Sequence, residues 1–185
     1  MPTFPEDLIR LYAARIGSRV KPRDTQQNWT RATREILKGA ASEHQWQSMC
    51  TGVRNHEFLL DFIAVAPDTG EVQVAVESEW GPLGAIIHDF RKLLYIKCNT
   101  KIMICGSGGE RLCSRLEAIA SKYSRHVAGE AYIVLDVSEA SMCLRSYVWT
   151  ATANGSSEVR FRPYLETIPF AFAAGTASGA QHRRE

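Results

Sequence analysis

The residues best suited to chemistry are three acids on two segments that are predicted to be neighbouring β-strands: Asp61, Glu77 and Glu79. Glu77 and Glu79 share one face of their segment, because side chains along a strand point to the same side at every second residue. The turn sequence 67–70 between the segments, Pro-Asp-Thr-Gly, predicts a β-hairpin. A regular hairpin places Asp61 opposite position 76, and a one-residue bulge places it opposite Glu77. In either register the carboxylates of Asp61 and Glu77 lie on adjacent strands, close to each other.

Carboxylates held this close repel one another, and half-buried ones also lose hydration, so the arrangement needs a compensating charge. A divalent cation supplies it, and oxygen ligands with room for water favour Mg²⁺ or Mn²⁺. Such a metal binds a phosphate oxygen and activates a water molecule for attack on phosphorus. The alternative is that Glu77 and Glu79 face solvent on an edge strand and that Asp61 only ends a strand. The apolar neighbours of Asp61, Leu60 and Phe62, weaken this alternative.

These acids and the segments after them resemble the restriction-endonuclease-like, PD-(D/E)xK, superfamily of nucleases. The resemblance covers about residues 30–137 and depends on the following features: Asp61, the hairpin turn, Glu77-Ser78-Glu79, a helical segment at 89–94 and an apolar strand at 101–104. It implies that Asp61 and Glu77 hold the catalytic metal. An acid on the preceding helix often completes such a site, and Glu35 is the best-placed candidate, followed by Glu43.

The chain departs from the superfamily pattern at two positions. Leu60 stands where the pattern has Pro before the Asp, and Glu79 stands where it has Lys. Two replacements for the Lys are open. In ExE restriction enzymes a second Glu acts on the attacking water, which is the role that Glu79 would take. Alternatively, Lys92 or Lys97 on the following helix supplies the cation.

The elements that must position these residues alternate between helices and strands. Helices are predicted at 5–16, 29–41, 85–98 and 110–123, and strands at 57–65, 71–80, 100–105, 131–137, 143–150 and 159–163. Residues 42–56 fit neither pattern. This order predicts an α/β fold with a mixed central sheet flanked by helices, and the resemblance narrows it to a restriction-endonuclease-like αβββαβ core. We expect an N-terminal helix and loop at 1–28, an α/β domain at 29–170 and a disordered tail at 171–185.

Composition indicates a globular protein, with 185 residues of which 45% are hydrophobic and 23% are charged. No apolar run reaches the roughly 18–20 residues of a membrane span, and the first residues lack the pattern of a secretory signal. The five cysteines form no CxxC pair, which argues against a zinc site or a disulfide framework. We therefore expect a cytoplasmic protein with reduced thiols and no membrane partner.

The net charge is only +2, but it is distributed unevenly along the chain. Residues 41–90 carry a net charge of −7, between blocks of +4 at 1–40 and +6 at 91–126. The pattern suits a metal-dependent enzyme acting on a polyanion, and it equally fits three differently solvated faces. In the first interpretation, the bases that would bind phosphate are Arg91, Lys92, Lys97 and Lys101.

The sequence thus predicts a Mg²⁺-dependent nuclease, with DNA preferred to RNA as substrate and endonuclease action preferred to exonuclease action. Asp61 and Glu77 would bind the metal, Glu79 would position or deprotonate the water, and Glu35 and Lys92 would assist. The resemblance also implies a homodimer. The alternative is a catalytically inactive module of the same fold that binds nucleic acid or a protein partner in a defence or mobile-element system. Affinity for a divalent cation separates the two.

Overall fold

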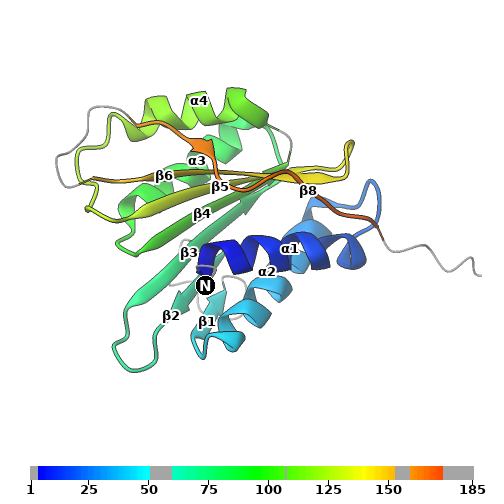
Figure 1. The fold of residues 1–185 in the computed structure, drawn as a ribbon, viewed down its shortest axis with the longest axis horizontal. Helices are drawn as coiled ribbons and strands as arrows, with labels where there is room; N and C mark the ends of the chain where they lie inside the picture. The colour runs from blue at the N-terminus through cyan, green and yellow to red at the C-terminus, as the bar shows by residue number, and fades with distance from the viewer. Residues whose placement is uncertain (1–3, 51–59, 107, 153–158, 173–185) are drawn as a thin grey trace, which may run out of the picture.

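The computed structural model describes residues 4–50, 60–106, 108–152 and 159–172, and these form a sheet with helices on both faces (Figure 1). The strands lie in the order β1-β2-β3-β4-β5-β6-β7, with β8 also paired to β6. Their bounds are β1 Gln47–Cys50, β2 Phe62–Val65, β3 Val72–Glu79, β4 Thr100–Gly106, β5 Ala131–Ser138, β6 Cys143–Thr150, β7 Arg162–Pro163 and β8 Ile168–Pro169. The helices are α1 Phe4–Arg19, α2 Gln26–Glu43, α3 Leu83–Tyr95 and α4 Gly109–Ala120.

The sheet is mixed, as predicted. β1, β2 and β3 pair antiparallel, β3, β4 and β5 run parallel, and β6 returns antiparallel to β5. The carboxyl ends of the three parallel strands therefore meet along one edge of the sheet. The short connections into α3 and α4 leave from this edge.

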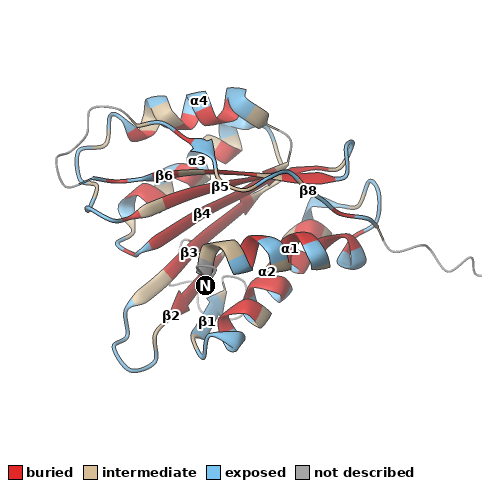
Figure 2. Cartoon of the chain, in the orientation of Figure 1, coloured by how far each residue is buried: buried red, intermediate tan, exposed pale blue. Residues whose placement is uncertain are grey.

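Two hydrophobic layers hold the helices to the sheet. α1 and α2 cover one face, and α3 and α4 cover the other (Figure 1), while the central strands between them are buried (Figure 2). The alternation of β3 sorts its side chains between the layers: Val74 and Val76 pack towards α1 and α2, and Ala75 packs towards α3. Glu77 follows Ala75 on the α3 side, so the alternation presents its carboxylate to that helix.

The predicted hairpin is confirmed, and it contains the bulge. Phe62 pairs with Val76 and Ala64 with Val74, but Val65 pairs with Val72, which leaves Gln73 as the additional residue. Asp61, one residue before the first pair, is therefore level with Glu77. The start of the predicted strand at 57–59 lies outside the described residues.

Several element boundaries differ from the predictions. α2 begins at Gln26 because the side chain of Thr25 accepts a hydrogen bond from the Asn28 amide and caps the helix. α3 spans Leu83–Tyr95, beginning directly after Pro82 and ending before Cys98. The segment at 42–56 that fitted no pattern contains β1, a mostly exposed edge strand. The tail at 173–185 lies outside the described residues. Among the helices that the structure describes, none is long and apolar enough to cross a membrane.

Candidate functional site

A cavity of about 680 Å³ opens beside the carboxyl end of β3, between α2 and α3. Ligands of open α/β sheets commonly bind at the carboxyl ends of parallel strands. The residues that line the cavity are mostly charged or polar: Gln26, Gln27, Thr30, Arg31, Arg34, Glu35, Lys38, Asp61, Glu77, Ser78, Glu79, Trp80, Asp89 and Lys92. The cavity therefore contains all three acids of the predicted cluster, together with Glu35 and Lys92.

Asp61 is held by donors from two elements. Its Oδ1 accepts a hydrogen bond from Nη2 of Arg34 on α2 at 2.7 Å. Its Oδ2 accepts from both the backbone amide and the hydroxyl of Ser78 on β3, each at 2.9 Å. These contacts fix the orientation of the carboxylate at the open end of the hairpin, away from the turn.

Glu77 is the most buried acid of the cavity, with only 1% of its surface exposed. Lys92 Nζ lies 2.6 Å from Glu77 Oε1 and 2.8 Å from Asp89 Oδ1, so one ammonium bridges two carboxylates. Burial raises the pKa of Glu77 to about 8, against the opposing effect of Lys92. Burial alone would lower the pKa of Lys92, but the hydrogen bonds to Asp89 and Glu77 outweigh it and raise that pKa above its ordinary value.

Glu79 and Glu35 line the same cavity but are engaged elsewhere. Glu79 Oε1 accepts a hydrogen bond from the backbone amide of Gly81 at 2.5 Å, which turns the carboxylate towards the end of its own strand. Glu35 forms an ion pair with Arg19. The second helix candidate, Glu43, pairs with Arg15 and is not among the residues that line the cavity.

The four residues predicted to bind phosphate lie in different parts of the structure. Of Arg91, Lys92, Lys97 and Lys101, only Lys92 lines the cavity. Lys97 lines a different cavity, with Glu71 and Glu130, and Arg91 is exposed on α3. The phosphate-binding role predicted for Lys101 is wrong. It is 1% exposed in the middle of the sheet, with its ammonium 2.8 Å from Glu130 Oε2 and 2.8 Å from the Tyr132 hydroxyl, so it cannot contact a phosphate at the surface.

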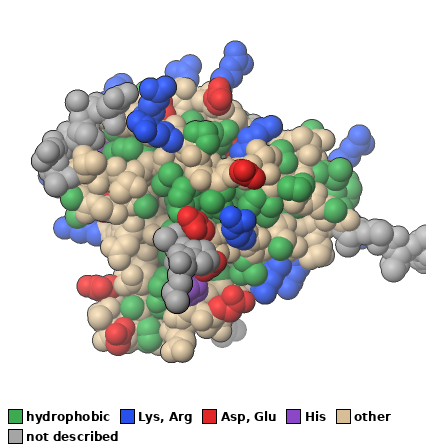
Figure 3. All heavy atoms as spheres, viewed as in Figure 1, with side chains coloured by type: hydrophobic (Ala, Val, Ile, Leu, Met, Phe, Trp, Pro, Cys, Tyr) green, Lys and Arg blue, Asp and Glu red, His purple; other side chains and the backbone are tan. Residues whose placement is uncertain are grey.

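Sequence reasoning missed the basic face of α2. Arg31, Arg34 and Lys38 all line the cavity, and their spacing of three and four residues is the signal that places them on one helix face. They set positive charge beside Asp61 and Glu77. Elsewhere, on the face that Figure 3 shows, Lys and Arg side chains are spread out and form no single patch.

The donor set suits a hydrated Mg²⁺ better than a metal enclosed by protein ligands. Within the described part of the chain, no group of three or more His, Cys, Asp or Glu side chains is arranged to hold a metal ion. Mg²⁺, however, typically keeps several waters and binds through one or two carboxylates plus substrate phosphates. Asp61 and Glu77 could supply two such carboxylates, and a cation between them would compete with Arg34 and Lys92 for their oxygens.

The sequence matches no protein-family model and no curated protein sequence. Function is therefore inferred from the geometry of this cavity.

Proposed function

We propose that this chain is a Mg²⁺-dependent nuclease that hydrolyses phosphodiester bonds in DNA as an endonuclease. The observation that carries the proposal is the meeting of Asp61 and Glu77 in one cavity, with Lys92 Nζ 2.6 Å from Glu77. The order α2-β1-β2-β3-α3-β4 supports a restriction-endonuclease-like core, because it repeats the αβββαβ order of that superfamily.

Each residue has a role that follows from its contacts. Asp61 and Glu77 would hold the metal, which when bound supplies a Lewis acid for the phosphate and an activated water. Lys92, held by Asp89 at 2.8 Å, is placed to donate hydrogen bonds to the negative charge that develops on the phosphate oxygens. Arg34 is placed to exchange Asp61 for a phosphate group of the substrate.

Lys92 is better placed than Glu79 to take the role of the lysine that the motif has two residues after the acid. Lys92 already contacts the buried carboxylate of Glu77, whereas Glu79 is bound to the Gly81 amide and must turn away from it to act on a water. We therefore assign the cationic role to Lys92 and treat Glu79 as a positioning residue for the end of β3.

The second candidate function is an inactive module that binds nucleic acid or a protein. It is favoured by the fact that Arg34 and Lys92 already neutralise the two carboxylates without a metal. In that case the cavity would attract phosphate groups through α2 but would have no hydrolytic function.

A cleavage assay tests the first proposal against the second. Supercoiled plasmid, linear duplex, single-stranded DNA and RNA are each incubated with Mg²⁺, Mn²⁺ or EDTA. We expect metal-dependent cutting of DNA that falls at least about 100-fold in Glu77→Gln and Asp61→Asn. Glu71→Gln, which neutralises an exposed acid just before β3, is the matched control and should cut normally.

Calorimetry with Mn²⁺ complements the assay. The nuclease should bind the ion through Asp61 and Glu77, and both variants should lose that binding. A folded wild-type chain that neither binds Mn²⁺ nor cuts any of the four substrates would contradict the nuclease and favour the module.

A further inference from the structure

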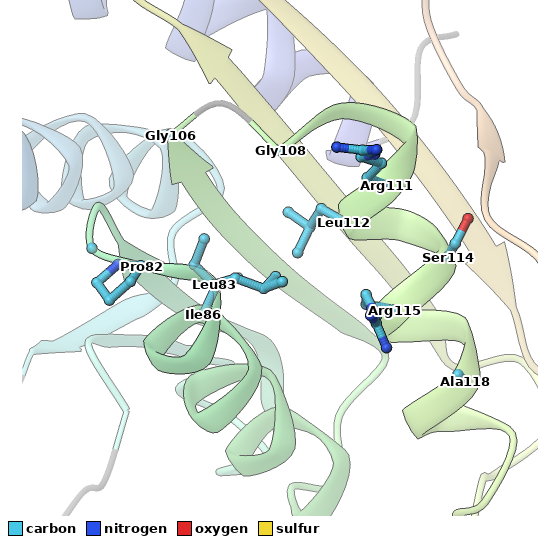
Figure 4. A pocket seen from close by; sticks show the side chains of 11 residues that line it. Pro82, Leu83, Ile86, Gly106, Gly108, Arg111, Leu112, Ser114, Arg115 and Ala118 are labelled. Atoms are coloured by element: carbon cyan, nitrogen blue, oxygen red, sulfur yellow. The ribbon is translucent and has the colours of Figure 1, made fainter.

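A second hollow lies beside the candidate site, between the start of α3 and the outer face of α4 (Figure 4). Its volume is about 860 Å³. The lining combines apolar side chains from both helices with two arginines from α4: Gly81, Pro82, Leu83, Ile86, Gly106, Gly108, Arg111, Leu112, Ser114, Arg115 and Ala118. We refer to it below as the α3–α4 groove.

The two arginines give the groove a positive charge, and no ion pair among the described residues offsets it. Arg111 and Arg115 are both exposed, and neither forms an ion pair with any side chain that the structure describes. Residues four apart on a helix have Cβ atoms about 5–6 Å apart, so the pair presents two guanidinium groups along one line. Neighbouring phosphates of a strand advance by about 3.4 Å along a duplex axis, so two such groups can contact one strand together.

The amides at the start of α4 are not the anion site. Gly108 and Gly109 donate their backbone N–H groups to Asp136 Oδ1 and Oδ2, at 2.9 and 3.2 Å. The carboxylate of Asp136 thus already occupies the helix end. An anion in the groove would be bound by the arginine side chains.

The groove continues the candidate site along the same edge of the sheet. Glu79 and Trp80 line the site, and the next residue, Gly81, lines the groove. A smaller cavity of about 300 Å³ shares Trp80 with the site and Gly106 with the groove, and Asp24, Val137 and Glu139 also line it. The hollows therefore follow one another past the carboxyl ends of β3 and β4.

The exposed apolar side chain of Leu83 bears on what kind of polyanion fits. Leu83 is 45% exposed, whereas two other apolar residues that line the groove, Ile86 and Leu112, are 4% and 1% exposed and belong to the core (Figure 4). A duplex keeps its bases stacked inside and offers a protein mainly sugar, phosphate and base edges. A single strand also exposes its base faces to contact with protein side chains, while basic residues follow its backbone.

We infer that the α3–α4 groove binds a single-stranded stretch of nucleic acid next to the bond that is cut. Arg111 and Arg115 contact its phosphates, and Leu83 contacts a base. The inference rests on the proposed nuclease function and deepens it, because it makes single-stranded or frayed DNA the preferred substrate.

The test measures binding without cleavage. Fluorescein-labelled oligothymidine is titrated with the full chain in EDTA, and its anisotropy is followed at several salt concentrations. Arg111→Glu/Arg115→Glu should weaken binding at least about tenfold, and Arg111→Ala/Arg115→Ala should reduce the salt slope by about 1.4, since each phosphate contact on a single strand contributes about 0.7. Leu83→Asp should also weaken binding, because it replaces the base contact with a negative charge.

Lys122→Glu/Arg125→Glu is the matched control. It makes the same change in net charge at two exposed bases that do not line the groove, and it should bind within about twofold of the wild type. An equal loss of affinity in this control and in Arg111→Glu/Arg115→Glu would contradict binding in the groove, because it would show a general effect of net charge. Equal affinity of the wild type for a blunt duplex, or displacement of oligothymidine by polyglutamate of equal charge, would overturn the single-strand specificity.

Binding in the groove and hydrolysis by the candidate site can be tested separately. Loss of oligothymidine binding in the groove variants alone, in a chain that cuts nothing, would support the groove and refute the hydrolysis. Cutting of single-stranded DNA that the groove variants leave unchanged would support the hydrolysis and refute the groove.

Discussion

Lys92 on α3 places its ammonium 2.6 Å from Oε1 of Glu77 on β3. The motif that the chain resembles has a lysine two residues after the acid on the same strand, where this chain has Glu79. The cation thus reaches the carboxylate from the neighbouring helix, and Asp89, one helical turn before Lys92, holds it there. Glu77 thus has a positive charge beside it, although its own strand has an acid two residues further on.

Lys92→Met should lower the rate of DNA cleavage at least about 100-fold, because it removes the cation that we propose to act beside Glu77. Lys97→Met is the matched control, since Lys97 lines a different cavity, and it should retain full cleavage. Initial cleavage rates with Mg²⁺ measure both. Normal rates in Lys92→Met together with a large loss in Glu79→Gln would return the role to Glu79.

The burial of Glu77 predicts that stability depends on pH. With a pKa of about 8 in the folded protein and an ordinary value near 4.5 in the unfolded chain, its carboxyl group keeps a proton longer when folded. Stability from this group is complete below about pH 4.5 and is lost as the pH rises to about 8. Relative to Glu77→Gln, the wild type should lose a few kcal/mol of unfolding free energy from about pH 5 to about pH 9, measured by urea denaturation in EDTA. A parallel profile for the two proteins would contradict the shift, and Glu79→Gln serves as the control that should follow the wild type.

Ser78→Ala tests how Asp61 is oriented. The variant removes the hydroxyl that donates to Oδ2 at 2.9 Å but keeps the backbone amide donor at the same oxygen. We expect a loss of about 0.5–1.5 kcal/mol in unfolding free energy and a moderate fall in cleavage. Ser121→Ala, which removes an exposed hydroxyl bonded to the Ala118 carbonyl, should change neither. A Ser78→Ala variant as active and as stable as the wild type would show that the amide and Arg34 suffice.

Lys101→Met should lower the unfolding free energy by about 3–5 kcal/mol, because it leaves the carboxylate of Glu130 buried beside Tyr132 without its cation. Lys101→Met/Glu130→Gln should recover part of the loss, since it removes both charges. Affinity for oligothymidine should stay unchanged in folded samples of both. A specific loss of DNA binding at unchanged stability would restore Lys101 to the phosphate-binding surface.

Local pattern was sufficient for the helices, the hairpin and the mixed sheet, because each depends on neighbours in sequence. The alternation at 72–76 and the turn at 67–70 together specify which acids meet. They also limit the register to two choices, of which the structure has the bulged one. The boundaries were less predictable, since caps such as Thr25 act through single hydrogen bonds.

The partners of each charge were not predictable, because they depend on packing between distant segments. Local pattern places Lys92 on a helix and Lys101 on an apolar strand, but it does not say that one borders a cavity and that the other is enclosed between Glu130 and Tyr132. Arg34 likewise meets Asp61 only because α2 lies across the hairpin. Periodicity on α2 was available as a signal for its basic face, but it does not say which face the site occupies.

The bulge at Gln73 sets which residue of β3 lies level with Asp61. Because Gln73 has no partner on β2, deleting it would leave Val65 paired with Val72 and Ala64 paired with Val74, so Asp61 would stay level with Glu77. Pairing Gln73 with Ala64 instead, without a bulge, would move Asp61 opposite Val76, whose side chain packs on the other face of the sheet. A β3 strand that is one residue shorter would thus keep the two acids level, and a straightened strand of the present length would not.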